Sequence, residues 1–285
     1  MSVYLLMVIP LLVVIAIFFV YPLTQIFYLS FYEYTPLVEK KFLGFGAYAR
    51  VLSDEVFIAT ILRSLIFVGV TVGANLMIGM GFALLTYKEV PGVKLLRTIL
   101  IIPMLFIPAA SAITWSLLYN EQIGLINHFL KAIGIRPREW LAHGSTAFPA
   151  VMVADIWGWL PFVYLILLAG LQSLPTECFE AADIDGASAW QKFWHVTLPM
   201  MEPIIAIATI LKSLDAFRTF VYMWVMTRGG PGDSTQVLST LIFSKAFRLF
   251  KYGSGSTMAA ITWAMAFVMS LAFLLVFRER ARREI

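Results

Sequence analysis

The chain has 285 residues, of which 60% are hydrophobic and only 13% are charged, and its formal net charge is +4. Soluble domains carry about 25% charged residues, so a soluble protein of this composition would expose large apolar patches to water. The composition therefore argues against a soluble enzyme, a nucleic-acid-binding domain and a disordered scaffold. It indicates a polytopic membrane protein with room for about six or seven spans of about 20 residues each.

Six apolar segments are long enough to cross a bilayer as helices. They lie at residues 4–28, 60–86, 98–119, 147–171, 203–226 and 258–277. No segment alternates polar and apolar residues over the length of a barrel strand. The sequence therefore predicts an all-α, polytopic membrane protein with six transmembrane helices, which form one domain over residues 1–285. A further short helix is expected at 125–133.

The segment 172–202, between the fourth and fifth predicted spans, is too polar to cross the membrane. Gly186 suits a left-handed cap at the end of a first short helix. Ser188 and Gln191 match the capping box that begins a second helix, and Pro199 is expected to end it. Two short helices joined at a glycine would form a rigid protrusion that fits a partner's cleft. The alternative is an amphipathic hairpin that rests on lipid headgroups.

Part of this segment resembles the signature of a known family. The pattern is Glu180-Ala181-Ala182, three further residues, Gly186, nine further residues and Val196-Thr197-Leu198-Pro199. It is similar to the EAA signature of the inner-membrane permease subunits of bacterial ABC importers. The usual isoleucine is replaced by Val196.

A second resemblance follows the fifth predicted span. The residues concerned are Met226-Thr227-Arg228-Gly229-Gly230-Pro231 and then Ser234-Thr235. They resemble a segment in the first of the two permeases of carbohydrate importers of the maltose and glycerol-phosphate type. The Tyr21-Pro22 and Ser30-Phe31 pairs are also similar to that group, so the resemblance covers essentially the whole chain.

The resemblance implies a MetI-like ABC permease fold in a bacterial inner (cytoplasmic) membrane. It implies that the segment 172–202 is a cytoplasmic coupling loop seated in a groove of an ATP-hydrolysing subunit. The implied partners are a second permease subunit in a heterodimer, two ATP-binding subunits and an extracytoplasmic solute-binding protein. The implied cargo is a carbohydrate, meaning a sugar, oligosaccharide, polyol or sugar derivative, and this chain would form half of the translocation pore.

The resemblance also assigns roles to individual residues. Those expected to couple to the ATPase are Glu180, Ala181, Ala182, Asp183, Gly186, Leu198 and Pro199. Those expected to contact the binding protein on the outer face are Gly229, Gly230, Pro231 and Ser234.

The chain itself is not expected to be an enzyme. It contains no Gly-x-x-x-x-Gly-Lys-Ser/Thr loop, so ATP and Mg²⁺ would be used by the partner ATPase, and this chain would bind no cofactor. One cysteine, Cys178, and three scattered histidines leave no ligand set for a structural zinc site, so no metal is expected. No nucleic-acid partner is expected either.

A few charged residues fall inside predicted spans, where they are costly and usually face the bundle interior. Asp155 lies in the fourth span. Lys212, Asp215 and Arg218 follow at spacings of three in the fifth span, so they share one helical face and can pair along it. They form either a self-neutralised ladder that holds helices together or a polar wall of the translocation path.

Aromatic residues close to these charges in the sequence are further candidates for the path. They are Trp157, Trp159, Tyr164 and Tyr222. Their rings could stack on sugar rings, as aromatic side chains often do in ligand pockets.

Two rival functions remain open at this point. One is an ABC permease for a solute that is not a carbohydrate. The other is a secondary transporter driven by an ion gradient, a class that often shows internal repeats, which the sequence lacks.

Overall fold

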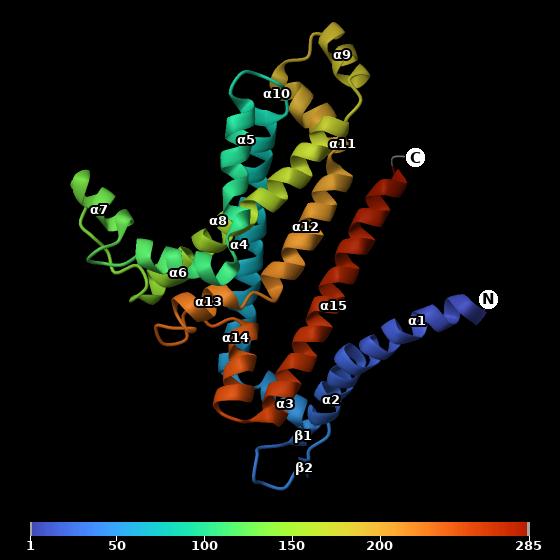
Figure 1. Ribbon diagram of the computed structural model, residues 1–285, viewed down its shortest axis with the longest axis vertical. Helices are drawn as coiled ribbons and strands as arrows, with labels where there is room; N and C mark the ends of the chain where they lie inside the picture. The colour runs from blue at the N-terminus through green and yellow to red at the C-terminus, as the bar shows by residue number, and fades with distance from the viewer. Residues whose placement is uncertain (1, 284–285) are drawn as a thin grey trace. The chain divides into compact units, whose positions relative to one another are not determined.

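The computed structural model describes residues 2–283, and they divide into two compact units. Unit 1 comprises Met1–Leu62 and Leu238–Phe267, and unit 2 comprises Arg63–Val237 and Val268–Ile285. Helices dominate both units, as the sequence predicts (Figure 1). Unit 1 also holds a short antiparallel hairpin, β1 (Tyr32–Glu33) with β2 (Lys41–Phe42), for which the sequence pattern gave no indication.

The α-helices follow one another in this order: α1 (Ser2–Ile15), α2 (Tyr21–Leu29), α3 (Gly46–Leu52), α4 (Glu55–Thr86), α5 (Val93–Ile101), α6 (Pro108–Leu118), α7 (Leu125–Ala132), α8 (Gly144–Ser173), α9 (Glu177–Ile184), α10 (Ala189–Lys192), α11 (Leu198–Met200), α12 (Glu202–Phe217), α13 (Val221–Met226), α14 (Leu238–Phe243) and α15 (Tyr252–Arg283). Three π-helical turns, Ala16–Val20, Phe193–Thr197 and Ser244–Arg248, extend neighbouring helices, and a 3₁₀ turn, Ile102–Leu105, follows α5. Helix α7 confirms the short helix expected at 125–133.

Among the described residues, four helical stretches are long and apolar enough to cross a membrane without a break. They are Val8–Leu29, Glu55–Thr86, Gly144–Ser173 and Tyr252–Phe273. They correspond to the first, second, fourth and sixth predicted spans, which are therefore confirmed as continuous apolar helices.

The third predicted span is bent, so the expectation of one helix over 98–119 is wrong. The segments Val93–Leu105 and Pro108–Leu118 meet at an angle of 101°. Ile107, at the bend, is extended, with φ −65° and ψ 143°. The ring of Pro108 disfavours a helical conformation of the residue before it, which explains why the helix stops there.

The fifth predicted span is also interrupted. Helix α12 ends at Phe217, and Val221 begins α13. Between them the backbone N–H of Arg218 donates to the carbonyl of Asp215 (3.1 Å), a tight bond that closes the last turn of α12. The expectation of one helix over 203–226 is therefore wrong.

The core of unit 2 is built from α4, α8 and α12. The buried hydrophobic cluster of this core consists of Met80, Ala83, Val163, Tyr164, Leu167, Leu168, Leu171, Met201 and Ala208. Gly170 lets α8 and α12 approach closely, because a Cβ there would lie 2.8 Å from a side-chain carbon of Ile204. Such small-residue contacts are typical of helix packing in membranes, where dispersion replaces the hydrophobic effect as the driving force.

Unit 1 is held by polar contacts at the ends of its helices. The Asp54 carboxylate accepts a hydrogen bond from the Val56 N–H (2.9 Å) and so caps the start of α4. Lys245 lies 3.6 Å from the same carboxylate. The buried Thr257 hydroxyl of α15 donates to the Ser30 carbonyl (2.8 Å). These contacts join the start of α4 to the turn after α14, and α15 to the end of α2.

Candidate functional site

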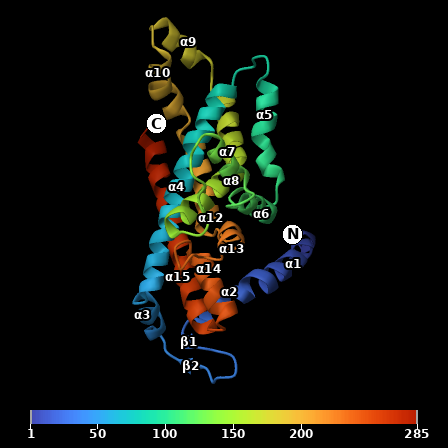
Figure 2. The same cartoon turned by 90° about the vertical axis from the view of Figure 1, so that its left-hand side faces the viewer.

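The polar segment between α8 and α12 forms a protrusion at one end of unit 2. Figures 1 and 2 show α9 and α10 beyond the ends of α5 and α8, whereas α6, α7 and α13 lie toward the other end of the unit. Helix α8 ends at Ser173, so the protrusion begins where a membrane-spanning helix stops. The two short helices expected from the sequence are both present.

Gly186 ends α9 in the left-handed conformation predicted for it, with φ +74°. The Gly186 N–H donates to the carbonyl of Asp183 (3.1 Å), and the Ala187 N–H donates to that of Ala182 (2.9 Å). This pair of bonds is the Schellman motif, which satisfies carbonyls left free at a helix end. It fixes the direction in which the chain leaves α9.

The capping box at the start of α10 is confirmed. The Ser188 N–H donates to the side-chain oxygen of Gln191 (2.8 Å), and the Gln191 N–H donates to the Ser188 hydroxyl (3.3 Å). Pro199 does not end this helix, contrary to expectation. It lies in α11, directly after the π-helical turn Phe193–Thr197. Helical backbone therefore continues from α10 to α12 with one turn residue, Met201.

Helix α9 presents the Glu180-Ala181-Ala182 pattern on an exposed surface. None of its residues is buried. Glu180 and Ala181 are exposed and Ala182 is half-buried, while Leu198 and Pro199 are half-buried and exposed respectively. A carboxylate beside small side chains on an uncovered helix leaves room for a partner surface to approach the backbone.

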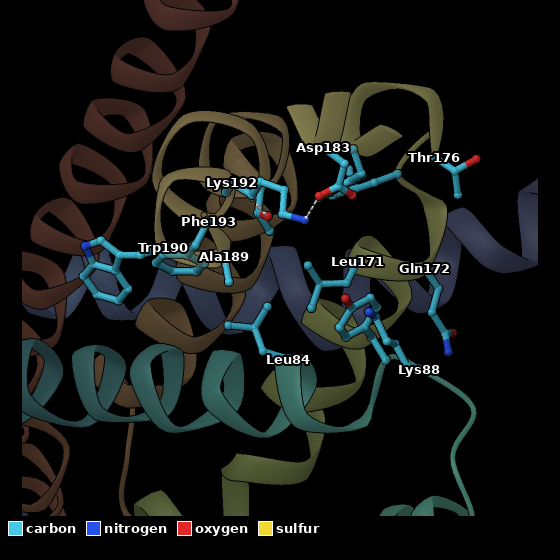
Figure 3. A pocket seen from close by; sticks show the side chains of 14 residues that line it. Leu84, Lys88, Leu171, Gln172, Thr176, Asp183, Ala189, Trp190, Lys192 and Phe193 are labelled. Atoms are coloured by element: carbon cyan, nitrogen blue, oxygen red, sulfur yellow. Dashed lines mark hydrogen bonds and ion pairs between the residues drawn. The ribbon is translucent and has the colours of Figure 1, made fainter. Parts of the chain in front are cut away.

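The two limbs of the protrusion are tied by one ion pair. The Lys192 ammonium of α10 contacts the Asp183 carboxylate of α9, and the two side chains are 25% and 61% exposed. Figure 3 shows this pair beside a hollow between the limbs and the ends of α4 and α8. The hollow has a volume of about 810 Å³. Leu84, Leu171 and Phe193 line its apolar part. Asp183 thus forms its ion pair within the segment 172–202 itself.

Deeper in unit 2, α8 and α12 are joined by a second ion pair. The Lys212 ammonium donates to the Asp155 carboxylate over 2.6 Å, and the side chains are 0% and 1% exposed. The ammonium also lies 4.9 Å from the centre of the Trp159 ring, which adds a cation–π contact. Lys212 therefore pairs with the neighbouring helix rather than along its own.

The remaining charges of the fifth predicted span pair with each other. The Arg218 guanidinium lies 3.7 Å from the Asp215 carboxylate. The Arg218 side chain is 79% exposed and that of Asp215 is 22% exposed. The predicted ladder is thus split into one buried link between helices and one pair that remains accessible from outside the chain.

The candidate aromatic residues likewise divide into buried and partly accessible side chains. The Tyr164 hydroxyl is buried and hydrogen-bonds that of Thr86 (2.8 Å), and the buried Tyr222 hydroxyl donates to Ser111 (3.1 Å). Trp157 and Trp159 are half-buried, and Trp157 packs edge-on against Trp115 at 5.9 Å between ring centres.

The glycine-rich segment after α13 forms a tight turn. Gly229 is in the left-handed region with φ +89°, and the Gly230–Pro231 peptide bond is cis. The Thr235 hydroxyl donates to the Gly230 carbonyl (2.9 Å), and its N–H donates to that of Gly229 (3.2 Å). Ser234 packs closely against Gly144, the first residue of α8. A Cβ added to Gly144 would lie 2.8 Å from the Ser234 Cβ. The turn is therefore fixed by its own hydrogen bonds, with Gly229 buried and Gly230, Pro231 and Ser234 half-buried.

Sequence reasoning missed Lys192, Thr86 and Ser111 as partners of candidate residues. Each is an ordinary residue in a helical pattern, and only the folded chain brings it to its partner. Within residues 2–283, no group of three or more His, Cys, Asp or Glu side chains is placed to hold a metal ion.

Comparisons with known proteins agree with this arrangement. A family model described as "Binding-protein-dependent transport system inner membrane component" matches residues 1–281. The trehalose/maltose transport system permease protein MalF of Thermococcus litoralis is 38% identical over 276 residues, covering 96% of this chain and 93% of that protein. The sulfoquinovosyl glycerol transport system permease protein SmoG of Agrobacterium fabrum is 29% identical over 273 residues, covering 95% of this chain and 89% of that protein.

The fold has a counterpart among solved structures. A chain in the crystal structure of a bacterial ABC transporter involved in the import of the acidic polysaccharide alginate aligns with a TM-score of 0.84 at 21% identity. The alignment covers 98% of this chain and 96% of that one. The chain therefore shares the fold of that transporter chain.

Proposed function

The chain belongs to the family of binding-protein-dependent transport system inner membrane components, and from this premise we propose that it is a permease subunit of an ATP-driven carbohydrate importer. It is a multi-pass membrane protein and a transport subunit. The observation that carries the proposal is the Glu180-Ala181-Ala182 pattern on the exposed helix α9, capped at Gly186. An uncovered, rigidly capped helix beyond the end of a spanning helix is suited to receive movement from a partner.

A carbohydrate is the proposed cargo because the relatives named above handle this class. MalF is named for trehalose and maltose, and SmoG for sulfoquinovosyl glycerol. These compounds share ring or polyol hydroxyl groups, and they differ in size and charge. The proposal therefore names sugars and sugar derivatives as a class.

The proposed assembly contains a second permease subunit, two ATP-binding subunits and an extracytoplasmic solute-binding protein in the cytoplasmic membrane. The family description itself names dependence on a binding protein. The chain has no phosphate-binding loop of its own, so ATP and Mg²⁺ would be bound by the separate subunits. In this assembly the protrusion faces the cytoplasm, and the turn containing Gly229, Gly230, Pro231 and Ser234 faces the binding protein.

The proposed mechanism transmits movement along one continuous structure. Closure of the ATP-binding subunits displaces α9, and α10 to α12 carry the displacement into the membrane because their helical backbone is almost unbroken. There Lys212 and Asp155 tie α12 to α8, so the two helices move together. A shift of this kind switches the pore between inward-open and outward-open states.

The translocation path, in this proposal, is lined by side chains that one subunit alone leaves accessible. Arg218 is exposed, and Asp215, Trp157 and Trp159 are half-buried. They can offer hydrogen bonds and ring faces to a sugar at the interface with the second permease. Asp155, Tyr164 and Tyr222 are buried within this chain and support the wall from behind.

The test is transport by the reconstituted complex. The chain is purified with its co-expressed partners, placed in liposomes, and supplied with binding protein loaded from a panel of sugars and sugar derivatives. We expect uptake of at least one carbohydrate that needs internal ATP and is blocked by vanadate. Uptake that follows an ion gradient without ATP would instead establish the secondary-transporter alternative. ATP-driven uptake of a non-sugar solute alone would refute the proposal that the cargo is a carbohydrate.

A further inference from the structure

Helix α9 is attached to the rest of the chain by surprisingly few interactions for an element that must transmit force. It has no buried residue, and about 810 Å³ of open space lies between the limbs of the protrusion and the ends of α4 and α8 (Figure 3). Across the described part of the chain, the Lys192–Asp183 pair is the only ion pair or side-chain hydrogen bond that links α9 to another element. The other attachments of α9 are the peptide backbone at its two ends and the half-buried side chains of Phe179 and Ala182.

The position of Lys192 makes this single link mechanically important. Lys192 is the last residue of α10, at the start of the helical stretch that leads through α11 to α12. Lys212 lies twenty residues further along this stretch, about 30 Å away at the helical rise of about 1.5 Å per residue, and is locked to Asp155 of α8. One ion pair therefore joins α9 to the start of the helical stretch from α10 to α12, and another joins α12 to α8.

We propose that Lys192 is a positioning residue for energy coupling, which clamps α9 to α10 so that movement of α9 is delivered to α12 instead of being absorbed by bending at the Gly186 turn. This inference rests on the proposed function, since it names a regulator of the same coupling loop. Without the clamp the hollow gives α9 room to tilt. ATP hydrolysis then continues while a smaller fraction of cycles moves the spans.

The size of the effect follows from the exposure of the pair. An exposed ion pair contributes only a small free energy, and the partly covered Lys192 side chain places this pair at the upper end of that range. Loss of the clamp should therefore leave folding and membrane insertion intact. The number of carbohydrate molecules transported per ATP hydrolysed should fall by roughly two- to fivefold.

The experiment compares Lys192→Met with the matched control Lys88→Met in the reconstituted complex. Lys88 lines the same hollow, and its ammonium lies 5.5 Å from the centre of the Tyr87 ring without contacting Asp183. We expect Lys192→Met and Asp183→Asn to lower transport per ATP, and Lys88→Met to leave it unchanged. The exchanged pair, Asp183→Lys with Lys192→Asp, should restore it. An unchanged ratio in Lys192→Met, or no recovery in the exchanged pair, would overturn the clamp.

A second readout does not depend on transport. Cys178, the single cysteine of the chain, is exposed on α9 and accepts a nitroxide label in the full-length protein in nanodiscs. Lys192→Met should increase the mobility of this label, whereas Lys88→Met should not. Equal mobility in both variants would refute the clamp even if the complex proved to be driven by an ion gradient. Absence of ATP-driven uptake in the unaltered complex would count against the proposed function alone.

Discussion

The Lys212 ammonium on α12 lies 2.6 Å from the Asp155 carboxylate on α8, and both side chains are fully enclosed within unit 2. The second carboxylate oxygen of Asp155 has no hydrogen-bond partner among residues 2–283. A buried pair of this kind costs much desolvation free energy, so its contribution to overall stability is small. Removing one partner, however, leaves an uncompensated charge in a low-dielectric interior.

We therefore expect Lys212→Met to destabilise the protein by about 3 kcal/mol or more, because the Asp155 carboxylate would be left alone. Asp155→Leu should have an effect of similar size for the converse reason. The double variant should recover most of the loss, since neither charge then remains. Unfolding of the detergent-solubilised protein by denaturant measures all three.

The control for these three variants is Arg218→Met, which removes a largely exposed cation six residues further along the chain, from a pair in which Asp215 is 22% exposed. Its free energy of unfolding should change by no more than about 0.5 kcal/mol. A double variant as unstable as either single variant would show that the pair is not the reason for the loss.

The second prediction concerns the turn at Gly186. A Cβ there would meet no atom within 4 Å, so the cost of Gly186→Ala is purely that of holding a side chain at φ +74°, about 1 kcal/mol. Gly186→Pro cannot adopt this conformation at all, because proline fixes φ near −65°. We expect Gly186→Ala to reduce ATP-driven uptake partially and Gly186→Pro to abolish it, with membrane insertion unchanged in both.

Gly134 provides the comparison, because it also has a left-handed backbone, with φ +79°, and open space around it. Gly134→Ala should lose a similar amount of stability but retain uptake, since it lies outside the protrusion. Normal ATP-coupled uptake by Gly186→Pro would mean that α9 does not dock on the ATPase.

The third prediction tests the contact between α8 and α13. A Cβ on Gly158 would overlap the hydroxyl of the buried Tyr222 and displace it from Ser111. Gly158→Ala should therefore cost about 1–3 kcal/mol through overpacking. Tyr222→Phe removes the oxygen that collides, so the double variant should be more stable than Gly158→Ala alone. Failure of Tyr222→Phe to relieve the loss would contradict this packing.

Local features of the coupling loop could be predicted from the sequence because they depend on neighbouring residues. The glycine cap of α9 and the Ser188–Gln191 box each involve residues a few positions apart, and both are present. The ion pairs could not be predicted in the same way. Asp183 and Lys192 are nine residues apart, and Asp155 and Lys212 are 57 apart, so only the fold brings them together.

The two interrupted spans show the same distinction. The bend before Pro108 had a sequence signal, because proline restricts the residue that precedes it, and hydropathy alone obscured it. The gap between α12 and α13 had none, since residues 218–220 include neither glycine nor proline. There Thr219 is buried, which only the folded chain shows.

The last prediction concerns Glu180. Its carboxylate is exposed and makes no ion pair or hydrogen bond within the described residues, so Glu180→Gln should change the free energy of unfolding by less than about 0.5 kcal/mol. If the carboxylate contacts the ATP-binding subunit, the same variant should weaken association between the two subunits several-fold. The loss should be largest at low ionic strength, where charge interactions are least screened.

Glu121→Gln supplies the matched removal of one exposed carboxylate, in the loop between α6 and α7 at the other end of unit 2. Binding of the purified ATP-binding subunit to each variant in nanodiscs, titrated at several salt concentrations, separates the two sites. Equal affinities for Glu180→Gln and Glu121→Gln would remove Glu180 from the docking surface. A salt-dependent loss confined to Glu180→Gln would assign it an electrostatic contact there, because its removal alters nothing within the chain itself.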